Sequence, residues 1–356
     1  MYIFLTIEEV KYMYKIGVFP GKFLPPHRGQ LNAIINASTR CEKLYVVVSD
    51  NSNVTKKLCE QSGIKVMDLK TRAKWLSIEL QNFDHIDVLM LDETEIPEQP
   101  RGWDSWTKLL IDIVPEKFDV VFGGEHKYRN PLRVSLPNVA YELFDYKRER
   151  YPISGTAIRD NALKHWDYIL GSVRPHFAKK VLITGTESCG KTTVTKYLAK
   201  IFHTSWVEEV GRYYSERYLG GNEEVYTLED FEKIVRLHME EEDKSIRMAN
   251  KIVFIDTDAT VTQYYCEMFL NEKSEKIDLL INPDRYDIVL MFAPDVKWVD
   301  DGLRWLSGDD RRWQLHNKLR DMYIERGFGD KIIEISGDYN ERLNKAIEII
   351  DGLLNV

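Results

Sequence analysis

The strongest chemical signal in the sequence is a glycine-rich run in its second half. Residues 181–193 read VLITGTESCGKTT, which satisfies the spacing G-x-x-x-x-G-K-[ST] between an apolar run and a helical pattern. Glycines in such a loop let backbone N–H groups surround phosphate oxygens, the lysine reaches the β- and γ-phosphates, and the hydroxyl ligates Mg²⁺. The sequence therefore predicts a P-loop for ATP. The residues expected to contact phosphate or metal are Gly185, Ser188, Gly190, Lys191, Thr192 and Thr193.

Acidic side chains follow two other apolar runs of the second half. Residues 251–258 read KIVFIDTD, and Asp256 or Asp258 could hold Mg²⁺ through water or orient a substrate hydroxyl. Acids at strand ends are also common helix caps. Glu209 ends a further run, where a carboxylate faces the crevice of an open α/β sheet. It is a candidate to bind or deprotonate an acceptor hydroxyl, and a surface salt bridge is the alternative.

A charged, glycine-containing string follows at residues 298–312, WVDDGLRWLSGDDRR. Its composition favours a lid in which Arg304, Arg311 or Arg312 meets the transferring phosphoryl group. A solvated charged loop would have the same composition. Trp298 could stack on a flat ring or fill a core.

The first half carries two strings typical of phosphate handling. Residues 21–30 read GKFLPPHRGQ after the apolar run IGVF, which places His27 just before a helix. Taken alone, such a histidine is more often structural than catalytic. Residues 153–159 read ISGTAIR, whose hydroxyls would cap a helix and whose arginine would add charge. The residues of this string expected to serve a triphosphate are Ser154, Thr156 and Arg159.

Short apolar runs alternate with helical patterns along the whole chain, which predicts βαβ units and mostly parallel sheets. A chain of 356 residues is too long for one ordinary core, so we expect two α/β domains. We place a connecting helical segment at 160–177, between domains at 15–159 and 178–356, with a short extension at 1–14. The expected strands are Ile16–Phe19, Leu44–Val48, Ile86–Leu91, Asp119–Phe122, Ala140–Phe144, Lys180–Gly185, Trp206–Val210, Ile252–Asp256, Ile288–Phe292 and Ile332–Ile335.

Composition excludes several classes of protein. A net charge of −8 argues against a dedicated nucleic-acid surface. The four cysteines are scattered, without the C-x-x-C pairs of a zinc site, and a reducing compartment suits them. No apolar run approaches a membrane span, and the N-terminus lacks the features of a signal peptide. We therefore expect a cytoplasmic protein that binds neither membrane nor nucleic acid.

The two strings of the first half resemble the G-x-F-x-P-x-H-x-G-H and I-S-x-T-x-x-R signatures of nucleotidyltransferases. From about residue 15 to the C-terminus, the order of domains and several strings resemble the bifunctional nicotinamide-nucleotide adenylyltransferase/ribosylnicotinamide kinase family of the NadR type. Residues 1–14 are too few for the helix-turn-helix repressor module of some members, so we expect no repressor role. The strings are Arg101–Trp106, Ile153–Asn161, the P-loop, Phe254–Asp258 and Trp298–Arg304.

The resemblance implies a Rossmann-like adenylyltransferase domain followed by a P-loop kinase domain, acting in NAD salvage. ATP, nicotinamide mononucleotide (NMN), nicotinamide riboside and NAD would be its partners and Mg²⁺ its cofactor. Gly21, Lys22 and Phe23 would belong to the ATP site of the first domain, and a homo-oligomer is compatible with the sequence. Trp103 and Trp106 would lie near the nicotinamide ring, where a flat aromatic face suits a cationic pyridinium; core packing is the competing explanation.

Gln30 departs from the signature, because it stands where the family has a second histidine. Its amide keeps a hydrogen-bond donor but cannot carry charge, so we expect a slow adenylyltransferase site. Lys22 or Arg28 could replace the lost charge instead. Two other hypotheses stay open: a kinase whose first domain is impaired, and a nucleotide-sensing regulator that acts through partners.

Overall fold

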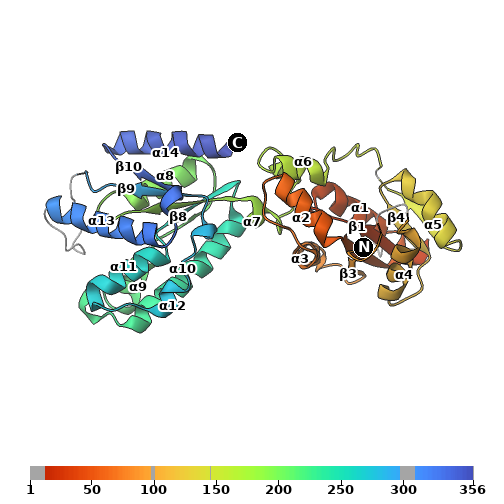
Figure 1. The fold of residues 1–356 in the computed structure, drawn as a ribbon, viewed down its shortest axis with the longest axis horizontal. Coiled ribbons are helices and arrows are strands. Elements are labelled where there is room, and N and C mark those ends of the chain that lie inside the picture. Colours follow the sequence, from red (N-terminus) through yellow and green to blue (C-terminus); the bar gives the residue numbers. More distant parts are fainter. Residues whose placement is uncertain (1–12, 98–100, 145, 297–308, 356) are drawn as a thin grey trace, which may run out of the picture. The chain divides into compact units, whose positions relative to one another are not determined.

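Two parallel sheets organise the chain, one in each half (Figure 1). The computed structural model describes residues 13–97, 101–144, 146–296 and 309–355. It divides the chain into two compact units, Met1–His176 and Phe177–Val356. Each of the ten strands expected from the sequence is present, which confirms the α/β class. β7 (Trp206–Val207) is shorter than expected, because the chain turns through two glutamates into a helix after Val207.

The first unit is a sheet of order β3-β2-β1-β4-β5 with parallel neighbours. Alternate residues of its strands enter two cores, since Val18 packs with α4 and α5 while Phe19 packs with α1 and α3. Its elements are β1 (Tyr14–Gly21), α1 (Arg28–Ser38), β2 (Cys41–Asp50), α2 (Ser52–Gln61), α3 (Leu69–Leu80), β3 (Ile86–Asp92), α4 (Trp103–Ile113), β4 (Val120–Gly123), α5 (Arg129–Ser135), β5 (Ala140–Leu143) and α6 (Gly155–Asp160).

The second unit has the order β10-β9-β6-β8-β7, again parallel. Helices α8 and α14 pack on one face of this sheet, and α10 and α11 lie on the other side (Figure 1). Its elements are α7 (Arg174–Phe177), β6 (Lys179–Thr184), α8 (Lys191–Ile201), β7 (Trp206–Val207), α9 (Val210–Tyr218), α10 (Leu228–Met248), β8 (Ile252–Asp256), α11 (Ala259–Leu270), α12 (Glu275–Asp278), β9 (Ile288–Phe292), α13 (Asp309–Glu325), β10 (Ile332–Ile335) and α14 (Tyr339–Leu354).

In both sheets the first strand lies at the point where the strand order reverses. β1 has β2 on one side and β4 on the other, and β6 likewise lies between β8 and β9. Ligands of open α/β sheets bind outside the carboxyl ends of the strands at such a reversal. The loops that follow β1 and β6 are therefore the places to examine for chemistry.

The connecting segment at 160–177 is helical only in part. α6 ends at Asp160, a single 3-10 turn follows at Trp166–Tyr168, and α7 spans only Arg174–Phe177. Turns replace the helix because the segment packs back onto the first unit, where Ile169 forms a backbone bridge with His27. No described helix has the length and apolarity needed to cross a membrane.

Candidate active sites

The loop between β6 and α8 adopts a conformation that depends on its glycines. Gly185 and Gly190 have φ angles of 140° and 83°, in the region that side chains disfavour. A Cβ atom on Gly185 would also lie 2.6 Å from the carbonyl oxygen of Phe292. The loop therefore packs directly on the end of β9, and α8 begins immediately after it with Lys191.

Lys191 is buried, and its Nζ donates a hydrogen bond to the Thr186 carbonyl oxygen at 2.9 Å. Burial acts to lower the pKa of this lysine, but its acidic neighbours, Glu209 and Asp256 among them, raise it above its ordinary value. Lys191 is therefore a positive charge in the floor of the loop. A buried cation of this kind attracts phosphate strongly, because little water screens it.

Asp256, the last residue of β8, faces the start of α8. The Thr192 Oγ1 donates to its Oδ2 at 2.5 Å, and within the described part of the chain its buried Oδ1 has no hydrogen-bond partner. Burial, together with the charge of Glu209, raises the pKa of Asp256 to about 7. A hydroxyl beside a carboxylate with an uncommitted oxygen matches the oxygen ligands that Mg²⁺ prefers.

Asp258 lies two residues further on but has a different environment. Its Oδ1 accepts from the backbone N–H groups of Thr260 and Val261, and also from the Tyr323 hydroxyl at 2.5 Å. Its Oδ2 lies 3.0 Å from the Thr260 hydroxyl. These are the contacts of a capping residue of α11, and they favour the structural alternative that the sequence left open.

A cavity of about 310 Å³ lies beside the P-loop. Lys191, Thr192, Glu209 and Thr257 contribute to its walls. Glu209 precedes α9 without capping it, so its carboxylate is not used by the helix. Aromatic rings form another part of the lining, and several of them stack nearly parallel, with centroids 4.8 to 5.9 Å apart. The aromatic residues are Tyr226, Phe231, Tyr265 and Phe269.

The charged string expected to form a lid is partly helical. α13 begins at Asp309, so Arg311 and Arg312 lie in its first turn and not in a loop. Arg312 is buried and donates to the Val296 carbonyl oxygen at 2.9 Å, and Arg311 is exposed and outside the cavity lining. Trp298 and Arg304 lie outside the described residues, so their roles stay predictions.

In the first unit, His27 is a buried residue that caps α1. Its Nδ1 accepts from the Gln30 backbone N–H at 3.4 Å, and the Gln30 Oε1 accepts from the His27 backbone N–H at 3.3 Å. This reciprocal pair is a capping box. Burial, with the charge of Arg148, lowers the pKa of His27 to about 4, so the ring is neutral at pH 7. Because Nδ1 accepts, the proton lies on Nε2, which is available as a donor.

The string ISGTAIR packs directly on the turn that contains His27. Ser154 caps α6 by accepting from the Ala157 N–H at 3.1 Å. Arg159 is buried and donates to the Leu24 carbonyl oxygen at 2.6 Å and to the Thr156 hydroxyl at 3.2 Å. A Cβ atom on Gly155 would lie only 2.4 Å from the same carbonyl oxygen. The structure thus brings the two strings together, although about 130 residues separate them.

The remaining residues expected in the first site differ in how accessible they are to a ligand. Phe23 has a φ of 48° and its ring is in the core, so only its backbone is available to a ligand. Lys22 is exposed, and a Cβ on Gly21 would meet the Phe23 ring at 2.9 Å. The two tryptophan rings are in edge contact, with centroids 5.8 Å apart, but they differ in burial. Trp106 is in the core, and Trp103 is half-buried with its ring centroid 5.3 Å from that of Tyr128.

Comparisons with known proteins agree with this geometry. Residues 180–342 match the family model described as AAA domain. The chain is 31% identical over 351 residues to the trifunctional NAD biosynthesis/regulator protein NadR of Escherichia coli (strain K12), covering 98% of this chain and 85% of that protein. The chain belongs to the NadR family. The resemblance drawn from the motifs is thereby confirmed, and this NadR-family chain is an enzyme of the nucleotidyltransferase and kinase classes.

Solved NadR structures share the fold over nearly the whole length. A crystal structure of NadR protein in complex with NR has a TM-score of 0.80 and 25% identity, covering 96% of each chain. A crystal structure of NadR protein in complex with NAD and AMP-PNP has a TM-score of 0.79 and 26% identity, covering 96% of this chain and 97% of that one. Both of the units described above are therefore features of the NadR fold.

Sequence reasoning missed the buried side chains that brace the two NadR loops. Arg72 of α3 is fully buried; it donates to the Lys22 carbonyl oxygen and pairs with Asp50 at the end of β2. Arg342 of α14 donates to the Cys189 carbonyl oxygen of the P-loop at 2.8 Å. No local spacing identifies such residues, because each reaches its loop from a segment distant in the sequence.

Proposed function

We propose that this protein is a bifunctional NAD salvage enzyme. Its second unit transfers the γ-phosphoryl group of ATP to the 5′-hydroxyl of nicotinamide riboside, giving NMN. Its first unit joins NMN to the adenylyl group of ATP, giving NAD⁺ and pyrophosphate. Both steps are transfers at phosphorus, in which a protein mainly positions the reactants and stabilises charge.

The observation that carries the proposal is the meeting of three features in one cavity. Lys191 and Thr192 supply the phosphate-binding end, Glu209 supplies a carboxylate not used by its helix, and aromatic rings supply flat apolar surface. A riboside with a cationic pyridinium ring suits such rings, and its 5′-hydroxyl needs a carboxylate partner. We assign to Glu209 the acceptance of the hydroxyl proton, since Asp256 is held by Thr192 and Asp258 caps α11.

Thr192 and Asp256 would hold Mg²⁺ in the kinase unit, and the uncommitted Oδ1 of Asp256 fits that role. The metal would neutralise charge on the ATP phosphates. The protein's own contribution is to place Lys191 and the backbone of Ser188, Gly190 and Thr193 around those phosphates.

In the adenylyltransferase unit, the Nε2–H group of His27 is proposed to donate to the α-phosphate of ATP. The phosphate of NMN attacks the α-phosphorus, and the bond to the pyrophosphate breaks without an enzyme-bound intermediate. Ser154 and Thr156 supply hydroxyls, while Arg159 fixes the turn through the Leu24 carbonyl oxygen. Trp103, at the half-buried start of α4, is the better placed of the two tryptophans to meet the nicotinamide ring.

The test uses the full chain with ATP and Mg²⁺, given nicotinamide riboside in one reaction and NMN in another. We expect the first reaction to yield NMN and then NAD⁺, and the second to yield NAD⁺ with one pyrophosphate for each NAD⁺. NMN without NAD⁺ would support the alternative of a kinase whose first unit is impaired. Absence of both products would contradict the proposal and favour a nucleotide-sensing regulator.

A further inference from the structure

Arg342 of α14 is a fully buried cation that contacts the P-loop. Its Nη1 donates a hydrogen bond to the Cys189 carbonyl oxygen at 2.8 Å, and its Nη2 donates to the Ala293 carbonyl oxygen at the same distance. Its Nε donates to the Gly337 carbonyl oxygen at 2.7 Å. Arg342 therefore joins three loops of the second unit, those that follow β6, β9 and β10.

A carboxylate also holds this guanidinium group in place. Asp295, in the loop after β9, forms an ion pair with Nη2 of Arg342, and its Oδ2 accepts the Gly337 N–H at 2.7 Å. The planar fork of an arginine suits such a set of acceptors, because its donors point in fixed directions. Since most of these acceptors lie in the loops after β9 and β10, the guanidinium group is fixed independently of the P-loop.

The contact with Cys189 decides which way one peptide group of the P-loop faces. The peptide between Cys189 and Gly190 is trans, so its carbonyl oxygen and its N–H point in opposite directions. Both residues line the cavity beside the P-loop, whereas Arg342 is absent from the lining that the structure describes. The Cys189 carbonyl oxygen thus points away from the cavity, and the Gly190 N–H points toward it.

The glycine leaves this peptide free to rotate unless something opposes it. Gly190 has a φ of 83° and no side chain that restricts the alternatives. If the peptide turned over, the Cys189 carbonyl oxygen would face the phosphates, where its partial negative charge repels an anion. The hydrogen bond from Arg342 opposes that rotation.

We propose that Arg342 is a positioning residue for phosphoryl transfer in the kinase unit. By binding the Cys189 carbonyl oxygen, it keeps the Gly190 N–H turned toward the phosphates of ATP. It acts through the loop and not on the substrates, since it lies outside the described lining of the cavity. The inference rests on the kinase activity proposed above.

The first test is Arg342→Lys in the full chain. A lysine keeps a positive charge beside Asp295 but lacks the planar fork, so it loses the ordered contact with the Cys189 carbonyl oxygen. A displaced donor should lower the kcat of riboside phosphorylation at least about tenfold and raise the KM for ATP by a similar factor. The KM for riboside and the rate of NAD⁺ formation from NMN should change less than about twofold. A variant with native kcat would overturn the inference.

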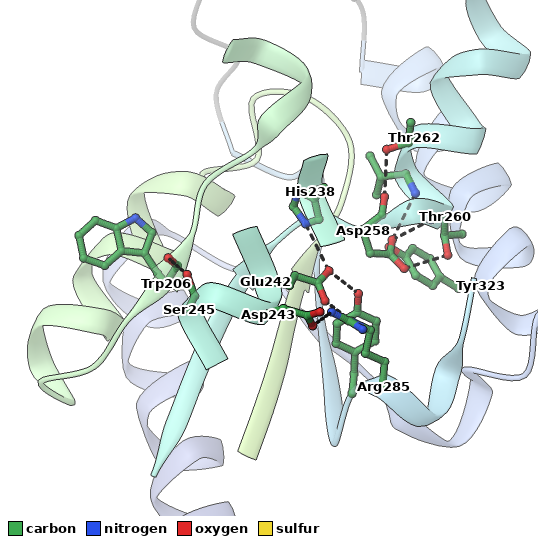
Figure 2. A network of polar contacts seen from close by, with 12 residues as sticks. Trp206, His238, Glu242, Asp243, Ser245, Asp258, Thr260, Thr262, Arg285 and Tyr323 are labelled. Carbon is green, nitrogen blue, oxygen red and sulfur yellow. Dashed lines mark hydrogen bonds and ion pairs between the residues drawn. The ribbon is translucent and has the colours of Figure 1, made fainter. Parts of the chain in front are cut away.

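Arg285→Lys is the matched control, because Arg285 is another arginine of this unit that forms ion pairs. Figure 2 shows its partners, Glu242 and Asp243 of α10. In the described part of the chain, none of these three residues lines the cavity. We expect this variant to lose stability while its kcat stays within about twofold of the native value. Equal losses of kcat in the two lysine variants would indicate a general loosening of the unit and would contradict a specific role for Arg342.

The sequence allows a direct measurement on the peptide itself. Cys189–Gly190 is the only Cys-Gly pair in the chain, so labelling with ¹³C′-cysteine and ¹⁵N-glycine selects one amide signal, that of Gly190. Because a charge-assisted hydrogen bond is short and strong, AMP-PNP with Mg²⁺ should shift this signal downfield in the native protein. The shift should be markedly smaller in Arg342→Lys, and a full native shift in that variant would contradict the proposal.

The labelled signal also separates this inference from the proposed function. A native protein that shows the shift but does not phosphorylate riboside would refute the proposed kinase function while supporting the orientation of the peptide. Absence of the shift in the native protein would overturn the inference without the need for any variant. Because the lysine variant can fail to fold, Asp295→Asn gives a milder route: it keeps shape and removes the charge that holds Arg342. Its kcat should fall several-fold, and an unchanged kcat would contradict the inference.

Discussion

The two units place the loops that follow their first strands at the same point of similar sheets, but the backbone demands of the two loops differ. The loop after β6 needs positive-φ glycines in its own backbone, and Arg342 of α14 braces one of its carbonyl oxygens from outside. The loop after β1 depends on side chains from elsewhere, since Arg159 and Arg72 both bind its carbonyl oxygens. A loop that needs glycine conformations restricts its own residues more than a loop without that requirement does.

The comparison predicts the largest effect for Lys191→Ala. Losing a buried cation that faces the transferring phosphoryl group should lower riboside phosphorylation by roughly 10²–10³ or more. Adenylyl transfer from supplied NMN should stay within about twofold, because the ATP site proposed for that reaction lies in a separate unit with its own core. Parallel assays of both reactions on one preparation measure this. A folded variant that lost both activities would contradict the assignment of two independent sites.

In the first unit, Gly155→Ala is the counterpart of Lys191→Ala in the second. The added Cβ would lie 2.4 Å from the Leu24 carbonyl oxygen, so α6 must move away from the turn that contains His27. A displacement near 1 Å at a reacting centre can cost about 10² in rate, and we expect a loss of that order in NAD⁺ formation from NMN. Riboside phosphorylation should not change. Ala157→Gly, in the same helix, is a control that changes helix propensity in the opposite direction without adding an atom.

These contrasts also explain how far the sequence could be read. The strands were predictable because runs such as Ile252–Asp256 are apolar and end in recognisable turns. The P-loop was predictable because its glycines are required by the backbone. Asp258 as a cap of α11 was one of the alternatives that the sequence left open. Two features were not predictable: α13 starts inside a string that reads as a loop, and Ile169 pairs with His27. Each is decided by packing between distant segments, which local spacing does not record.

His27 makes the stability of the first unit depend on pH. Burial, with the charge of Arg148, lowers its pKa from 6.5 to about 4 in the folded chain, so the unfolded chain binds the proton first as pH falls. The stabilisation is complete above about pH 6.5 and is lost progressively down to about pH 4, by up to roughly 3 kcal/mol. Hydrogen exchange of the α1 amides, corrected for intrinsic rates, measures it.

The control for this pH dependence is His27→Asn, which keeps a good capping residue but does not titrate. As the pH falls from 6.5 to 4, the native chain should lose local stability of α1 while the variant does not. Any advantage of the native chain over the variant should therefore shrink, or the variant should become the more stable of the two. Parallel pH curves for the two proteins would show that His27 is not held neutral by burial.

The smallest expected effect concerns Gln30, whose side chain has one role in the structure and a second that we propose. Its Oε1 completes the capping box with His27, and we expect its Nε2 group to be a neutral donor to phosphate. Gln30→His should raise the kcat of NAD⁺ formation by only a few-fold, because a charge-assisted hydrogen bond is about twice as strong as a neutral one but the capping acceptor is weakened.

Gln30→Glu separates the roles, since it keeps the acceptor, removes the donors and adds a negative charge. We expect it to leave the stability of α1 within about 0.5 kcal/mol and to lower kcat about tenfold. If Gln30→Glu turned over as fast as the native protein, Gln30 would serve only the cap, and His27 with its surrounding arginines would account for catalysis at this site.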